Sequence, residues 1–81
     1  MKMKDYSGVL KEMSIDCQRR LILEHLIRMG SITAMEAVEE YGCYRLSARI
    51  ADLREMGVEI VTIMMENRHN SGHHAKYILD K

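Results

Sequence analysis

The hydrophobic residues of the chain first recur at helical spacing between residues 17 and 29. The apolar stripe consists of Ile22, Leu23, Leu26, Ile27 and Met29. Asp16 precedes the stripe and is a favourable N-cap residue. Gly30 follows it, where a helix C-terminus favours a residue in the left-handed conformation. The pattern therefore predicts a helix over residues 17–29 that occupies the centre of the core.

A second, shorter helix is expected after Ser31 and Ile32, which form a short extended link. Thr33 and Glu36 have the spacing of a capping box, in which each side chain accepts a hydrogen bond from the backbone N–H of the other residue. Gly42 ends this helix soon afterwards. Its inner face is expected to contain Ala34 or Met35, together with Ala37, Val38 and Tyr41.

A third helix is expected over residues 45–56, and Gly57 ends it. Leu46, Ile50 and Leu53 recur at intervals of four and three residues and should face inward. Two helices joined by a short glycine-containing turn form a helix-turn-helix unit. The second and third predicted helices match that spacing.

Beyond Gly57 the pattern changes to that of strands. Residues 58–65 are rich in β-branched side chains, residues 67–72 have turn composition, and residues 75–79 alternate as a return strand. Three helices followed by a β-hairpin predict an α+β winged helix-turn-helix, in which residues 31–32 can add a minor third strand. We expect a partly flexible N-terminal arm over residues 1–15 and the domain over residues 16–81.

Composition narrows the function classes. The 81 residues are 47% hydrophobic and 30% charged, with a formal net charge of zero, which is typical of a single globular domain. No apolar run approaches the roughly 20 residues of a membrane span. Cys17 and Cys43 are isolated and are expected to be reduced thiols in a cytoplasmic protein. No catalytic motif is recognisable, so we predict a protein that is not an enzyme and carries no cofactor or metal.

A family resemblance rests on several short segments between Gln18 and Leu79. They are residues 30–33 (GSIT), 36–37 (EA), 44–54 (YRLSARIADLR), Gly57 and 77–79 (YIL). On these segments the chain resembles small winged helix-turn-helix proteins common in bacteriophages and prophages. The resemblance implies a winged-helix fold and binding of double-stranded DNA, in a role such as transcription regulation.

The first candidate DNA-binding surface is the outer face of helix 45–56, because the second helix of such a pair enters the major groove. Arg45 is suited to pairing with guanine, Ser47 to a base or a phosphate, and Ala48 to a thymine methyl. Arg49 lies closer to the core and is expected to reach a phosphate. The candidate residues on this surface are Tyr44, Arg45, Ser47, Ala48 and Arg49.

The second candidate surface is the wing, hairpin 66–76, because residues 67–79 contain no acidic side chain. Wings commonly contact phosphates or the minor groove. The candidate residues on this surface are Arg68, His69, His73 and Lys76. Histidines gain positive charge below about pH 6.5, so DNA binding should strengthen there.

Both surfaces have a plainer interpretation. Arg45 and Arg49 can form intrahelical pairs with Asp52 on a solvated face, and the hairpin can be an ordinary polar turn. The zero net charge and the acidic second helix favour a different function, a winged helix that binds and inhibits a host protein, as anti-CRISPR proteins do. The excess apolar residues of strand 58–65, Val61, Ile63 and Met65, point to a homodimer or a protein partner. The sequence leaves these alternatives open.

Overall fold

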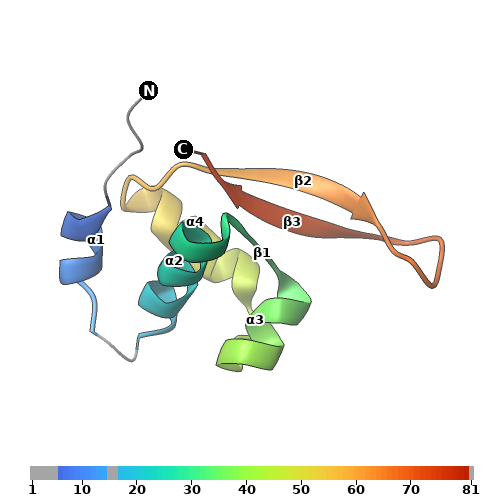
Figure 1. Ribbon diagram of the computed structural model, residues 1–81, viewed down its shortest axis with the longest axis horizontal. Helices are drawn as coiled ribbons and strands as arrows, with labels where there is room; N and C mark the ends of the chain where they lie inside the picture. Colours follow the sequence, from blue (N-terminus) through green and yellow to red (C-terminus); the bar gives the residue numbers. More distant parts are fainter. Residues whose placement is uncertain (1–5, 15–16, 81) are drawn as a thin grey trace.

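The computed structural model describes residues 6–14 and 17–80 (Figure 1). Within these ranges lie four helices and three strands. In chain order they are α1 (Ser7–Lys11), α2 (Gln18–Met29), β1 (Ser31–Thr33), α3 (Ala34–Tyr41), α4 (Leu46–Glu55), β2 (Ile60–Glu66) and β3 (His73–Leu79). This order confirms the predicted α+β winged helix-turn-helix and adds the short helix α1 in front of it.

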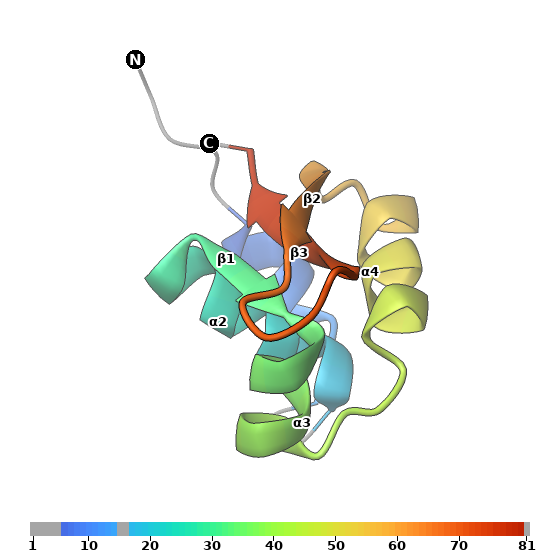
Figure 2. The same cartoon turned by 90° about the vertical axis from the view of Figure 1, so that its right-hand side faces the viewer.

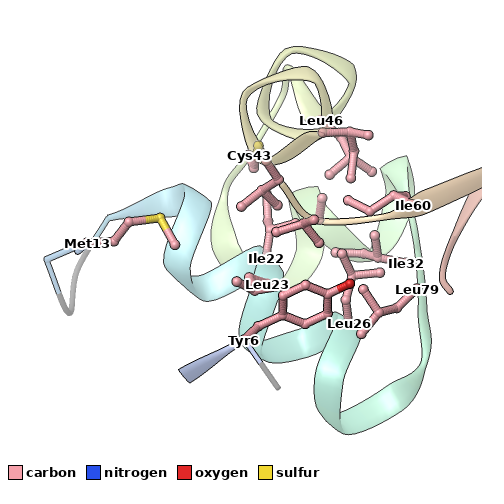
Figure 3. Close-up of a cluster of buried hydrophobic side chains, with 14 residues drawn as sticks. Tyr6, Met13, Ile22, Leu23, Leu26, Ile32, Cys43, Leu46, Ile60 and Leu79 are labelled. Atoms are coloured by element: carbon pink, nitrogen blue, oxygen red, sulfur yellow. The ribbon is translucent and has the colours of Figure 1, made fainter. Parts of the chain in front are cut away.

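Helix α2 is the centre of the core, as its apolar stripe predicts. Ile22, Leu23 and Leu26 are fully buried, and α2 packs against α1, α3, α4 and β1 (Figure 3). Met29 was expected in the same stripe, but that prediction is wrong because 62% of its surface is exposed. Periodicity gives the inward side of a helix and not how far the covering elements extend along it.

The ends of α2 follow the predicted signals in part. Gly30 has a φ of 88° and ends the helix in the left-handed conformation. The predicted N-cap, Asp16, lies outside the described residues. Cys17 occupies the N-cap position, and the helix begins one residue later than expected, at Gln18.

Helix α3 has the predicted capping box. The Glu36 carboxylate accepts from the Thr33 backbone N–H at 2.9 Å, and the Thr33 hydroxyl accepts from the Glu36 backbone N–H at 3.3 Å. Ala37 is buried in the core. Neither alternative for the first turn is correct, because Ala34 is exposed and Met35 is 70% exposed. The side of the first turn that faces the core depends on how α3 leaves β1, and hydrophobic periodicity does not predict that direction.

The remaining members of the predicted inner face of α3, Val38 and Tyr41, are half-buried. The buried face of α4 is the predicted one: Leu46, Ile50 and Leu53 are each at most 3% exposed. Its bounds are shorter than expected, since Arg45 is the N-cap and Met56 the C-cap.

The strands form an antiparallel sheet in the order β1-β3-β2. The minor strand predicted at residues 31–32 is present, and Ile32 pairs with Tyr77 of β3. β2 begins at Ile60 rather than Val58, and Val58 is buried in the core just before the strand. The hairpin of β2 and β3 extends well past the helices, with its turn farthest from them (Figure 1).

The segment before α2 packs onto the domain. Tyr6 and Met13 belong to the buried core, at 7% and 6% exposed. The Arg20 guanidinium donates to the backbone carbonyls of Leu10 and Met13 at 3.2 and 3.1 Å, and the Tyr6 hydroxyl accepts from the Glu59 N–H at 3.3 Å. Sequence patterns gave no reason to expect these contacts, since they join distant parts of the chain.

Candidate nucleic-acid interface

The turn between α3 and α4 places Tyr44 in solvent. Gly42, with a φ of 62°, reverses the chain, and its N–H donates to the Val38 carbonyl at 3.0 Å. The N–H of Cys43 donates to the Ala37 carbonyl at 3.0 Å, and its side chain is 1% exposed. Because Cys43 anchors the turn in the core, the next residue points outward. Tyr44 is 83% exposed, which is the largest exposure among the large hydrophobic side chains of the described residues.

The first turn of α4 continues this exposed surface. Arg45 and Ser47 are exposed, and Ala48 is half-buried. Among the described residues Arg45 forms no ion pair, so the solvated pairing considered for it does not form. Seen from the hairpin turn, α4 lies to one side of the hairpin, with β1 and α2 on the other side (Figure 2). Helix α4 therefore lies at an outer edge of the molecule.

The N-terminus of α4 is electrostatically open. No side chain caps it, and its first turn contains no acidic residue. The first amide groups of a helix have no intrahelical acceptors, and the helix dipole makes this end positive. An uncapped helix N-terminus is therefore suited to bind an anion such as a phosphate.

Arg49 is already engaged within α4. Its guanidinium lies 3.2 Å from the Asp52 carboxylate, and both side chains are about one-third exposed. Its Nε atom is buried and has no hydrogen-bond partner among the described residues. The plainer interpretation, an intrahelical pair, holds for Arg49, although the pair leaves one donor unused.

The wing has a turn organised by two asparagines. The Asn70 side-chain oxygen accepts from the Gly72 N–H at 2.7 Å and from the Asn67 amide at 2.8 Å. The Nδ1 atom of His74 lies within hydrogen-bond distance of the Asn67 side-chain oxygen, at 2.6 Å. Three of the predicted contact residues are exposed at or next to this turn: Arg68, His69 and His73.

Lys76 lies elsewhere than the other wing residues. It is half-buried in the middle of β3, where it pairs with Thr33 on one side and Ile63 on the other. The sequence pattern placed Lys76 in the return strand of residues 75–79 and also counted it among the wing contacts, and β3, which begins at His73, includes it. The structure thus brings together Tyr44, Arg45, Ser47 and Ala48 at α4, and Arg68, His69 and His73 at the hairpin tip.

Sequence reasoning missed the partner of the acidic helix α3. His25 of α2 is 2% exposed, and its Nδ1 atom lies 2.7 Å from the Tyr41 hydroxyl and 3.2 Å from the Glu40 carboxylate. The Tyr41 hydroxyl also accepts from Arg28 at 3.4 Å. Two of the three acids of α3 therefore have structural partners, Glu36 in the capping box and Glu40 at His25. The pairing of buried His25 with Glu40, on a different helix, leaves no local signal in the sequence.

Arg54 is a second residue that sequence reasoning did not single out. From the last turn of α4 it donates through Nε and Nη2 to the Ile60 carbonyl, at 3.2 and 2.8 Å, and through Nη2 to the Thr62 hydroxyl at 2.8 Å. These bonds fix the base of the hairpin to α4. A basic residue in the last turn of a helix was the one available signal.

The two cysteines are free thiols. Burial raises the pKa of the Cys17 thiol, but backbone hydrogen bonds from Arg20 and Arg19, with the Arg19 side chain, bring that pKa below its ordinary value. The described residues contain no group of three His, Cys, Asp or Glu side chains placed to hold a metal ion. None of their helices is long and apolar enough to cross a membrane.

The chain belongs to the winged helix-turn-helix domain family, whose family model matches residues 17–81. No curated protein and no solved structure matches the chain in the corresponding comparisons. The fold and the family together define a class of domain that in general binds DNA and is typically not enzymatic.

Proposed function

We propose that this protein is a small regulator or accessory protein of phage or prophage type, which binds double-stranded DNA with α4 in the major groove and the β2–β3 hairpin as its wing. The observation that carries the proposal is the open N-terminus of α4, surrounded by exposed Tyr44, Arg45 and Ser47. Arg45 reads a base edge, preferably guanine, and the Ser47 hydroxyl and the α4 amides bind the adjacent phosphate.

Charge segregation accounts for binding by a chain of zero net charge. Residues 44–49 include two arginines and no acid, and residues 67–79 include no acid. Glu36 and Glu40 are held by groups of the domain itself. These two segments therefore carry positive charge although the chain is neutral, and phosphate contacts depend on local charge.

A salt titration of DNA binding tests the proposal. A fluorescent random-sequence duplex is titrated with the protein at several salt concentrations, and anisotropy gives the affinity. We expect affinity to fall with a log–log slope of about −0.9 for each phosphate contact. Binding that persists at about 0.5 M salt, or no binding at about 50 mM salt, contradicts the proposal.

Substitutions assign roles within the interface. Arg45→Ala should weaken binding to a selected sequence by about fivefold to 150-fold and relax base preference, whereas Arg68→Ala should weaken all sequences alike. Arg28→Ala is the matched control, because Arg28 is an exposed arginine on α2, away from the proposed surface. Equal losses from Arg45→Ala and Arg28→Ala would remove the recognition role from α4.

The competing hypothesis is a winged helix that inhibits a host protein. The observation that favours it is an open groove of about 880 Å³ between α3 and the hairpin tip, with Met35, Val38 and Met65 in its wall. The same titration separates the two functions, since a protein that acts only in this way has no salt-sensitive affinity for duplex DNA.

A further inference from the structure

Strand β2 is an edge of the sheet. The strand order is β1-β3-β2, so β3 lies along one side of β2 and no strand of the described residues lies along the other. An edge strand presents a row of backbone N–H and C=O groups that another strand can bind. The hydrogen bonds at the two ends of β2 show which backbone groups face outward.

The backbone N–H and C=O groups of the odd-numbered residues in this segment point toward β3. The N–H of Asp80 donates to the Glu59 carbonyl, and the N–H of Asn67 donates to the Gly72 carbonyl, both at 3.0 Å. Backbone groups alternate between the two sides of an antiparallel strand. The backbone groups of the even-numbered residues therefore point away from β3. The Ile60 carbonyl is consistent with this, because it accepts hydrogen bonds from Arg54 of α4 rather than from β3. The open part of the edge comprises Thr62, Met64 and Glu66.

The side chains along this edge are apolar and exposed. Val61 is 49% exposed, Ile63 38%, Met64 62% and Met65 38%. Edge strands of soluble proteins are usually protected by lysine, proline, a bulge or a covering element. β2 has no charged residue before Glu66 and no proline, and its distal part lies beyond the helices (Figure 1). Such an edge is suited to pairing with a further strand.

We propose that the edge of β2 pairs antiparallel with β2 of a second copy of this chain, about a two-fold axis at Met64. In this register Met64 lies opposite Met64 of the second copy, and Thr62 lies opposite Glu66. The outward-facing residues are then opposite one another, as hydrogen-bonded pairs require. Ile63 lies opposite Met65 on the other face, which makes an apolar cross-strand pair.

Charge complementarity identifies a second copy as the occupant. Thr62, Met64 and Glu66 share one face of the strand because side chains alternate. The Thr62 hydroxyl is 2.8 Å from the Arg54 guanidinium. Glu66 of one copy, opposite Thr62 of the other, therefore approaches Arg54 of that copy. The two-fold axis generates this Glu66–Arg54 pair twice, and no like charges are brought opposite one another.

The register also keeps the two helical bodies apart. The Ile60 residues of the two copies are separated by eight residue steps along the paired strands, roughly 27 Å. Because the Ile60 carbonyl already accepts hydrogen bonds from Arg54, the two copies of β2 pair only over Thr62–Glu66. So short a ladder gives a small interface and a concentration-dependent dimer. This dimer does not depend on DNA binding.

Sedimentation equilibrium of the full chain, without DNA, tests the dimer. We expect reversible dimerisation, and we expect Met64→Lys to weaken it at least about tenfold because two lysines then face each other at the axis. Met29→Lys is the matched control, since Met29 on α2 is equally exposed, at 62%. A chain that stays monomeric up to about 1 mM, or equal effects of the two substitutions, would overturn the proposal.

Disulfide cross-linking tests the register. In a Cys17→Ser background, Met64→Cys places two thiols on the axis, with Cα atoms about 5.5 Å apart, within the range of a disulfide. Thr62→Cys is the control, because the two introduced thiols lie four residue steps apart, roughly 13 Å. Covalent dimer should form on mild oxidation with Met64→Cys alone. Cross-linking by Thr62→Cys in preference to Met64→Cys would overturn the assigned register.

Discussion

The two helices of the helix-turn-helix pair begin in opposite ways. α3 closes its own N-terminus with the Thr33–Glu36 capping box, so its first amides and its positive end are satisfied internally. α4 has no side-chain cap and no acid in its first turn, and exposed Arg45 stands at its N-cap. In the proposed function, α3 supports the domain, and the uncapped start of α4 is available to bind an external anion.

The acidic residues of α3 and α4 are also placed differently. Glu40 of α3 lies beside the buried His25 of α2, whereas Asp52 and Glu55 lie in the second half of α4. The positive end of α4 therefore has no carboxylate of its own helix close to it. Local distribution, rather than net charge, distinguishes the surface that we assign to DNA.

A carboxylate in the first turn of α4 should have the largest effect, because it makes α4 resemble α3. Ser47→Asp should stabilise the fold by about 0.3–1 kcal/mol through the helix dipole. It should lower DNA affinity by about 100-fold or more, because facing a phosphate with a like charge costs several kcal/mol. Urea unfolding and duplex anisotropy measure the two effects.

The uncharged control for that change is Ser47→Asn, which keeps the polarity and adds no charge. It should retain most of the DNA affinity. Unchanged affinity in Ser47→Asp would mean that the start of α4 faces away from DNA.

Removing the hydroxyl that joins α3 to α2 should affect stability alone. Tyr41→Phe removes the 2.7 Å partner of the buried His25 Nδ1 and leaves it the Glu40 carboxylate at 3.2 Å, which should cost about 0.5–1.5 kcal/mol of unfolding free energy. Tyr44→Phe, at an exposed site, should change stability by less than about 0.5 kcal/mol. Urea denaturation of both variants gives the comparison, and equal stability losses would contradict the structural role of Tyr41.

The caps themselves provide a smaller test. Thr33→Ala removes the capping hydroxyl of α3 and should cost about 1 kcal/mol of stability while DNA affinity stays constant. Ser47→Ala should show the reverse, a loss of affinity of a few-fold and a stability change within about 0.5 kcal/mol. Loss of both properties in either variant would erase the distinction between the two helices.

The wing histidines should give the smallest effect. His69 and His73 are exposed near the hairpin turn and belong to the proposed wing contact. The double substitution of His69 and His73 by Gln should weaken DNA binding by no more than a few-fold, measured by duplex anisotropy. An affinity equal to that of the unsubstituted chain would remove the two histidines from the interface.

The helical features that sequence predicts correctly are those with local causes. The capping box of α3, the left-handed Gly30 and Gly42, and the buried stripe of α4 each depend on residues within a few positions of one another. Met29 and Met35 were misplaced because exposure depends on which distant elements cover a helix. Local pattern fixes the inward direction, and tertiary packing decides how much is covered.

The candidate site likewise has local features that the sequence shows and contacts between distant elements that it does not. The sequence shows that residues 44–49 contain no acid, but it placed the start of the helix at Arg45, which the structure shows to be the N-cap. The contacts of His25 with Glu40 and of Arg54 with Ile60 join different elements and become visible only when those elements are packed. Lys76 was counted among the wing contacts, but it lies within the paired part of β3, and a sequence pattern does not show how far along the hairpin the pairing extends.

The most direct test of the central claim is an NMR titration of the ¹⁵N-labelled chain with duplex DNA at low salt. The backbone amides of residues 44–49 should show the largest shifts, followed by those of residues 67–74 at the wing. The amides of α3 should move least among the helices of the pair. Largest shifts in α3, or an unchanged spectrum at residues 44–49 on saturation with duplex, would contradict the assignment of α4 as the DNA-binding helix.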